Sequence, residues 1–527
     1  MDADLVLYNG FVYDMVNPSP NQAIAIRAGK VLKTGSDREI LSLLRPEGIA
    51  IDLKGATAIP GLVDGHFHLL SYALRLSTLD LTGLDSKDKV LEKVATKVSS
   101  IPEGQWVIGG GWDRNLWPDP SFPTYKDLDV VASNHPVALW SKDGHTLWLN
   151  SLALKELGIN PFTPDPPGGV IERDEFGQPT GILKEKAAEL VRQRVEASSP
   201  LLQRSVEEAM ESLLRKGLVG LHNCEDERAL ALLQSLKSQG KLKMRILHHI
   251  PAENLEAAVK LGIKSGFGDE YLRIGGVKIF ADGTLGSRTA AMLEPYLGEP
   301  ENLGILTITP DELEMLVLKA GEAGLSVAVH AIGDRANRVV LDALEKAPRL
   351  RHRIEHVQLL TAEDLPRLAK LGVVASMQPI HATSDMEMAE RYWGKERCRW
   401  AYAWRSLLEA GTILAFGSDC PVEPPEPLLG IYAAVTRRRL DGSPGPEGWF
   451  PEQRLKVEEA IRAYTWGNAF AAGEEKSRGT LAPGFLADIT ILSEDIFRTA
   501  PEKIPTIEVL GAIIGGEIAF LHSALSS

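Results

Sequence analysis

The sequence predicts an α/β protein: a (β/α)8 TIM barrel with a small β-sandwich domain and an insertion after the first barrel strand. Three observations support this prediction. Both chain ends consist of short strand-like runs, the middle alternates between strands and amphipathic helices, and a stretch rich in Trp, Pro and Gly interrupts that alternation. Hydrophobic residues make up 44% and charged residues 24% of the 527 residues, as is usual for a folded globular protein.

The β-sandwich is predicted from residues 1–55 and 475–527 together. The first segment contains "DLVLYNGFVYD" and "QAIAIRAGKVLKTG", and the second contains "GFLADITILSED" and "IEVLGAIIGGEIAFL". In these runs apolar residues alternate with polar ones, and Gly or Asn marks the turns. Two β-rich segments that flank the rest of the chain predict one sheet domain built from both ends.

The barrel is predicted from residues 56–474. Between residues 203 and 419, helices and apolar, mostly uncharged strands follow one another in repeated units. Such repeats form parallel sheets, because each helix returns the chain to the start of the next strand. Six of these strands, the strand 62–68 and one expected at 136–142 ("PVALWSK") are counted as the eight strands of the barrel, and the insertion covers about 70–200.

Charge and cysteine content exclude several classes of protein. The net charge is −14, from 57 basic and 71 acidic residues, which argues against nucleic acid or an anionic membrane as the main partner. The three cysteines show no C-x-x-C spacing, so neither a disulfide framework nor a cysteine zinc site is expected. No signal peptide and no apolar run of about 20 residues is visible, so we expect a cytoplasmic protein.

Polar side chains collect at the ends of the predicted strands, where a barrel carries its chemistry. The strand 62–68 ends in His66 and His68, whose side chains point the same way because side chains alternate along a strand. Later strands end in Lys278, His330, His356 and Asp419. A single strand-end histidine is more often an ordinary polar residue, but imidazoles and a carboxylate converging on one rim are the ligands that Zn²⁺ prefers. The set therefore predicts a metal site.

The ordered motifs resemble those of the amidohydrolase superfamily of metal-dependent hydrolases. They are "PGLVDGHFH", "VKIFADGTLGSRTA", "VAVHAIGD", "RIEHVQ", "FGSDCPVEPP" and "RGTLAPGFLADITIL". The pieces "KDGHTLWLNSLAL" and "PPGGVIERDEFGQPTGILKE" narrow the resemblance to the family 3 group, which is similar to N-substituted formamide deformylases. The resemblance covers essentially the whole chain.

The resemblance implies a binuclear site that holds two divalent ions, expected to be zinc. His66, His68 and Asp419 would bind the first ion, and His330 and His356 the second. Lys278 would carry a CO2-derived carbamate and bridge the two ions, which also explains a lysine in the apolar run "VKIF". A mononuclear site in which Lys278 is only salt-bridged stays open.

The resemblance further implies hydrolysis of a C–N bond other than a peptide bond. A metal-bound hydroxide would attack an amide or an N-formyl or N-acyl small molecule, with Asp419 as general acid and base. A deaminase is the alternative enzyme, although the H-x-x-E that mononuclear deaminases carry is absent at residues 330–334. A non-catalytic regulatory member is the alternative outside enzymes. A homodimer is expected only from base rates.

Four residues are predicted to meet the substrate: Trp112, His145, Arg288 and His381. Trp112 would wall an apolar pocket or belong to the core of the insertion, and His145 would follow the second barrel strand. Arg288 would meet a carboxylate or a carbonyl, or form a salt bridge over the Gly-rich loop, and His381 would polarise a carbonyl. The alternative for His145 is a hydrogen bond that orders its loop. Glu355 is expected on the opposite face of its strand from His356, where it would either support a metal ligand from outside the ligand set or be structural.

Overall fold

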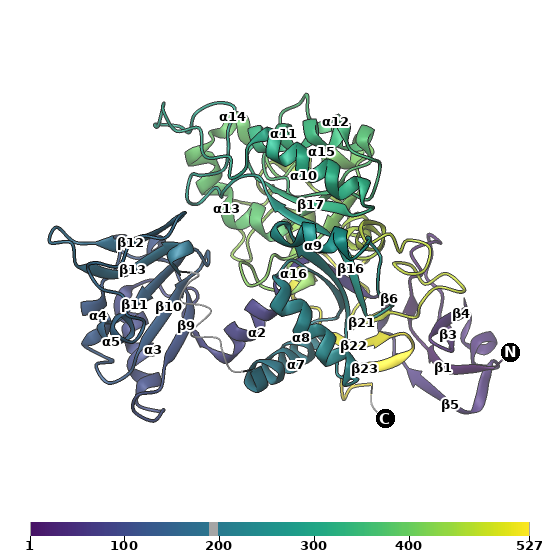
Figure 1. The fold of residues 1–527 in the computed structure, drawn as a ribbon. Helices are drawn as coiled ribbons and strands as arrows, with labels where there is room; N and C mark the ends of the chain where they lie inside the picture. Colours follow the sequence, from purple (N-terminus) through teal and green to yellow (C-terminus); the bar gives the residue numbers. More distant parts are fainter. Residues whose placement is uncertain (1, 189–198, 526–527) are drawn as a thin grey trace. The chain divides into compact units, whose positions relative to one another are not determined.

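The computed structural model describes residues 2–188 and 199–525, which form two compact units (Figure 1). One unit comprises Met1–Leu69 together with Met210–Ser527, and the other comprises Leu70–Ala209. The first unit holds the barrel and the β-sandwich, and the second is the insertion. None of the helices in the described residues is long and apolar enough to span a lipid bilayer.

The first unit contains eight parallel strands in the order β20-β19-β18-β17-β16-β15-β14-β7. They are β7 (Leu62–Phe67), β14 (Leu218–Asn223), β15 (Arg245–Pro251), β16 (Leu272–Phe280), β17 (Ser326–Ala331), β18 (Arg353–His356), β19 (Val374–Met377) and β20 (Leu414–Phe416). A parallel bridge between Phe67 and Cys420 brings the two edges together. The predicted (β/α)8 barrel is confirmed.

Helices alternate with the barrel strands, as the repeated pattern predicts. They are α7 (Ser199–Arg215), α8 (Glu227–Ser238), α9 (Leu255–Lys260), α10 (Pro310–Glu322), α11 (Asp334–Lys346), α12 (Leu365–Leu371) and α15 (Trp404–Glu409). Local sequence fixes their ends. Thr309 and Glu312 form a capping box at the start of α10, and Gly372 ends α12 with φ +71°. Further helices are α13 (Pro379–Tyr392), α14 (Lys395–Cys398), α16 (Pro427–Thr436), α17 (Val457–Arg462) and α18 (Asn468–Ala471).

The strand expected at 136–142 is not a barrel strand. It is β10 (Val137–Ser141), which pairs with β9 (Val107–Trp112) and β11 (Thr146–Leu149) in the inserted unit. Apolar composition alone assigned it to the barrel, but its hydrogen bonds to β9 and β11 place it in the inserted sheet. Besides β7, the barrel contains seven strands, and all of them come after residue 199.

The inserted unit has its own mixed sheet in the order β12-β13-β11-β10-β9-β8. Its other strands are β8 (Leu79–Asp80), β12 (Gly169–Arg173) and β13 (Pro179–Glu185), and its helices include α3 (Lys87–Val98), α4 (Tyr125–Asp129) and α5 (Ser151–Glu156). Trp112, Trp117 and Trp148 pack against one another in its core, with ring centroids 5.8–6.5 Å apart. The tryptophans of the insertion therefore form part of its hydrophobic core.

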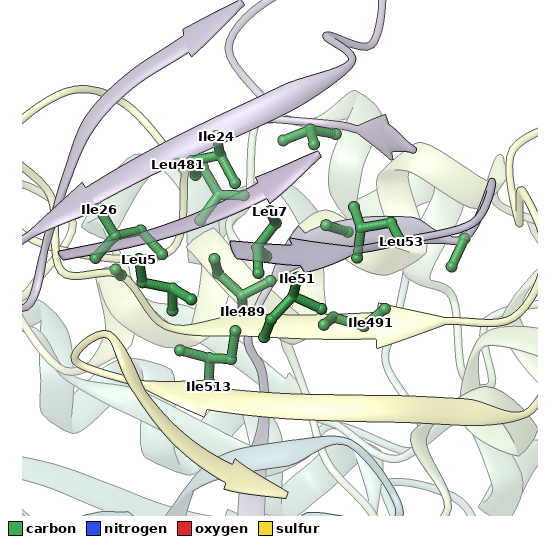
Figure 2. Packing of buried hydrophobic residues seen from close by; sticks show 14 of the residues in the cluster. Leu5, Leu7, Ile24, Ile26, Ile51, Leu53, Leu481, Ile489, Ile491 and Ile513 are labelled. Atoms are coloured by element: carbon green, nitrogen blue, oxygen red, sulfur yellow. The ribbon is translucent and has the colours of Figure 1, made fainter. Parts of the chain in front are cut away.

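The β-sandwich combines two sheets from both ends of the chain. One sheet has the order β4-β3-β1-β5 and the other the order β2-β6-β21-β22-β23. Their strands are β1 (Ala3–Tyr8), β2 (Phe11–Val12), β3 (Ala23–Arg27), β4 (Lys30–Gly35), β5 (Leu44–Asp52), β6 (Thr57–Pro60), β21 (Ile489–Leu492), β22 (Val509–Ile514) and β23 (Glu517–Leu521). Figure 2 shows aliphatic side chains from both sheets meeting in one core, such as Leu7 with Ile489 and Ile491. Alternation along each strand directs these side chains inward.

Candidate metal centre

The carboxyl ends of the barrel strands bring the predicted ligands into one region. His66 lies in β7, and His68 directly follows that strand. Asp419 follows β20, the strand at the other end of the strand order, which the Phe67–Cys420 bridge brings next to β7. Lys278, His330 and His356 lie in β16, β17 and β18. All of these residues are buried except His68, which is partly exposed.

The Asp419 carboxylate is at the centre of this region. Its Oδ1 atom lies 3.1 Å from Nε2 of His68 and 3.4 Å from Nε2 of His66. Its Oδ2 atom lies 4.0 Å from Nδ1 of His356. His66, His356 and Asp419 each offer a ligand atom, and these atoms all lie within 4.8 Å of one another. This spacing and donor chemistry fit a divalent metal ion.

Each of three histidines is held through one ring nitrogen, which leaves the other nitrogen available. The contacts are His66 Nδ1 with Glu355 Oε2 at 2.5 Å, His330 Nε2 with the Gly283 carbonyl at 3.0 Å, and His356 Nδ1 with Gln378 Oε1 at 2.9 Å. Because all three partners are oxygen acceptors, the imidazole N–H donates in each case. Metal-binding histidines commonly use this arrangement, since it fixes the tautomer and the ring orientation.

Burial keeps these histidines in the neutral form that a metal ligand requires. Burial and the charge of Lys278 lower the pKa of His66 to about 4 and the pKa of His330 to about 3. Burial also lowers the pKa of His356 well below its usual range. Burial disfavours the Asp419 carboxylate, but interactions with His66 and the hydrogen bond with His68 hold its pKa well below the usual range. Neutral imidazoles thus surround an ionised carboxylate.

Lys278 is the unusual member of the group. Its Nζ atom is buried and has no hydrogen-bond partner among the residues that the structure describes. The ring of Phe280 lies 4.8 Å from it. A buried ammonium without an anionic partner is costly, so this atom fits a site completed by a further group.

The backbone is strained at two predicted ligands. His356 has φ +74° and Asp419 has φ +59°, in the left-handed region that residues other than glycine rarely adopt. Such strain costs roughly 1–3 kcal/mol at each residue and collects at functional sites. The fold therefore holds both side chains in place at a cost in stability.

Glu355 contacts His66, as expected of a residue that supports a ligand from outside the ligand set, although strand alternation predicts that it faces away from His356. Its carboxylate is fully buried and accepts the hydrogen bond from His66. Alternation assumes extended backbone, and the left-handed φ of His356 turns that ring toward the same region. The charged pair Arg353 and Glu355, two residues apart in an apolar strand, was the signal in the sequence that both point into the barrel.

Two predicted substrate residues belong to this unit. Nε2 of His381, at the start of α13, is buried, lies 3.9 Å from Oδ2 of Asp419 and has no hydrogen-bond partner among the described residues. Nδ1 of His381 lies 3.3 Å from Nε2 of Gln358. Arg288 is half-exposed, pairs with Glu299 and lies over the ring of Tyr392.

The other two predicted substrate residues belong to the inserted unit. Trp112 is buried in its core, where Nε1 donates to the carbonyl of Leu139 at 2.8 Å. His145 precedes β11 and does not follow a barrel strand, because β10 is part of the inserted sheet. Its Nδ1 atom lies 2.9 Å from Oε2 of Glu185.

The barrel and the histidine and carboxylate donors at its mouth define a metal-dependent hydrolase. Residues 50–520 match the family model described as "Amidohydrolase family", and the chain belongs to this family. It is 37% identical to the putative amidohydrolase YtcJ of Bacillus subtilis over 98% of this chain and 99% of the relative. It is 28% identical to the N-substituted formamide deformylase of Arthrobacter pascens over 98% of both chains. The crystal structure of an uncharacterized metal-dependent hydrolase from Pyrococcus horikoshii matches with a TM-score of 0.81 and 31% identity, covering 94% of this chain and 99% of that one.

Proposed function

We propose that the protein hydrolyses the C–N bond of an amide, in an N-formyl or N-acyl small molecule. The observation that carries this proposal is the ionised Asp419 carboxylate, which contacts His66 and His68 and lies beside His356 and His381. The similarity to an N-substituted formamide deformylase along the whole chain supports the same substrate class.

The proposed centre would hold two divalent ions, expected to be zinc. His66, His68 and Asp419 would hold one ion, His330 and His356 the other, and a carbamate on Lys278 would bridge them. The Nζ atom of Lys278, which has no hydrogen-bond partner in the described part of the chain, supports the carbamate, because carboxylation converts a buried cation into an anionic ligand. When bound, a divalent ion polarises the substrate carbonyl and lowers the pKa of water to near neutrality.

Side chains of the protein then transfer the proton. The Asp419 carboxylate accepts a proton from the water whose oxygen adds to the carbonyl carbon. It returns that proton to the nitrogen as the C–N bond breaks, so that an acid and an amine leave. Nε2 of His381, whose Nδ1 faces the amide of Gln358, would donate a hydrogen bond to the carbonyl oxygen. Arg288 would bind a substrate carboxylate or carbonyl once its pair with Glu299 opens.

Two features favour this reaction over the alternatives. The residue three places after His330 is Gly333, so the H-x-x-E of mononuclear deaminases is missing. A regulatory protein without catalysis would have no need to keep strained backbone at His356 and Asp419, because that strain lowers its stability.

A substrate screen tests the proposal. Zinc-loaded protein is assayed for release of amine from N-formyl, N-acyl and cyclic amides, and chelator-treated protein serves as the control. We expect zinc-dependent turnover of at least one amide class. Uniform inactivity toward amides together with ammonia release from an aminated heterocycle would replace the proposal with the deaminase.

A further inference from the structure

A buried chain of polar groups lies beneath His66 and is not part of the proposed reaction. It runs from Glu355 to Arg353 and on to His222, all of which are at most 1% exposed. We infer that Glu355 is a positioning residue that sets the metal affinity of the centre by holding His66. This inference rests on the proposed metal centre and names the group that tunes it.

The first contact of the chain fixes the histidine tautomer. Nδ1 of His66 donates to Oε2 of Glu355 at 2.5 Å, because an ionised carboxylate can only accept. Nε2 of His66 is then the unprotonated nitrogen, and it faces Oδ1 of Asp419 at 3.4 Å. Without Glu355, the ring would be free to rotate or to protonate the nitrogen that the metal needs.

Arg353 holds the carboxylate in that position. Its guanidinium donates through Nε to Oε1 and through Nη2 to Oε2 of Glu355, the latter at 3.0 Å. The same Nη2 donates at 2.5 Å to the carbonyl of Gly65, the residue before His66, and to the hydroxyl of Ser376. Arg353 therefore fixes both the partner of His66 and the backbone that carries His66.

His222 completes the set of donors and acceptors. Nη1 of Arg353 donates to Nδ1 of His222 at 2.7 Å, since a guanidinium has no acceptor. Every nitrogen of the Arg353 guanidinium is thus engaged. The Arg353–Glu355 pair is neutral as a whole, so Glu355 can strengthen His66 as a ligand without adding a net charge beneath the metal centre.

Two variants test this role, and each removes a buried carboxylate that is paired with an arginine. Glu355→Gln removes the carboxylate that faces Arg353 and His66. Asp488→Asn is the matched control, because Asp488 is a buried carboxylate that receives Nε of Arg245 at 2.6 Å and Nη2 at 2.8 Å. The described hydrogen bonds of its carboxylate reach Arg245 and Gly515 and no predicted ligand. Each variant removes the carboxylate partner of a buried arginine, but only Glu355→Gln changes a residue that contacts the metal centre.

Zinc affinity is measured by competition with a chelator, and the absorption spectrum is recorded with Co²⁺ in place of zinc. We expect Glu355→Gln to weaken zinc binding about 10–100-fold, as loss of a carboxylate partner of a metal-binding histidine does. Its Co²⁺ spectrum should also shift. Asp488→Asn should keep wild-type affinity and spectrum while losing stability. Equal affinity and equal spectra in wild type and Glu355→Gln would overturn the inference.

A second variant keeps the test decisive if Glu355→Gln does not fold. The double variant Glu355→Met with Arg353→Met removes both charges, an exchange that buried ion pairs often tolerate. It should lose zinc affinity to the same degree, and wild-type affinity would overturn the inference. Wild-type protein that binds no zinc would instead overturn the proposed metal centre, so the two failures are distinguishable.

Discussion

The β-sandwich and the mouth of the barrel are both buried, but they bury opposite kinds of side chain. The sandwich core is aliphatic, with residues such as Leu7, Ile489 and Ile491 fully enclosed (Figure 2). The mouth encloses imidazoles, a carboxylate and the buried Lys278, on backbone that is left-handed at two predicted ligands. One region gains stability from burial, and the other gives up stability to hold polar groups in place.

This difference separates two kinds of effect. Changes in the sandwich should alter the free energy of unfolding and leave the centre unchanged. Changes at the mouth should alter metal binding or turnover more than stability. Matched variants of the two regions test that separation.

The largest effect is expected from Asp419→Asn. The amide cannot accept the proton from water, so kcat for the amide substrate should fall about 10³–10⁴-fold. The measurement is kcat with zinc-loaded protein, and Asp441→Asn, an exposed aspartate that caps Ser443, is the control and should be unchanged. Turnover within tenfold of wild type would contradict the assigned role.

Ile491→Ala should act on stability alone. The side chain is fully buried in the sandwich core, so its truncation should lower the free energy of unfolding by about 3 kcal/mol. Denaturant unfolding measures this change, and Ile518→Ala, 39% exposed on β23, should stay within about 0.5 kcal/mol of wild type. A loss of zinc affinity in Ile491→Ala would break the separation between the two regions.

His381→Asn should lower kcat about 100-fold with the zinc content unchanged, because it removes one donor to the carbonyl oxygen. The exposed His522 provides the control as His522→Asn, which should retain full activity. Metal content and kcat are measured on the same samples. Unchanged turnover in His381→Asn would exclude this donor from the reaction.

The smallest effect concerns pH and the buried His248, whose Nδ1 faces Nδ2 of Asn223 at 3.2 Å. Burial lowers the pKa of His248 to about 4, against 6.5 in the unfolded chain. Between these values only the unfolded chain binds the proton, so this residue costs about 1.4 kcal/mol of stability per unit as pH falls below 6.5. In chelator-treated protein, His248→Asn should flatten the stability–pH slope by that amount. Parallel slopes for the two proteins would contradict the pKa.

Most of the fold follows from periodicity in the sequence. The repeated helix and strand units predict where the barrel strands after residue 199 lie, and the alternation in both end segments predicts the sandwich. The strand 136–142 was misassigned because an apolar strand of a mixed sheet has the same composition as a barrel strand. Only its pairing with β9 and β11 distinguishes the two.

The sequence predicts less of the site than of the fold. The ligand candidates follow from their places at strand ends. Glu355 was expected either to support a ligand or to be structural, and its contact with His66 decides between these roles, because a strand pattern does not encode which side chains of distant strands meet. The sequence also did not decide the role of Trp112. A tryptophan in a loop-rich insertion looks the same in the sequence whether it packs into a core or contacts a ligand.

The metal content of the purified, zinc-loaded protein tests the central claim most directly. Mass spectrometric metal analysis of wild type and Lys278→Met should give two zinc ions per chain for wild type and at most one for the variant, which should also be inactive. Wild-type protein without bound zinc would contradict the metal centre. Two zinc ions and full activity in Lys278→Met would contradict the bridging lysine.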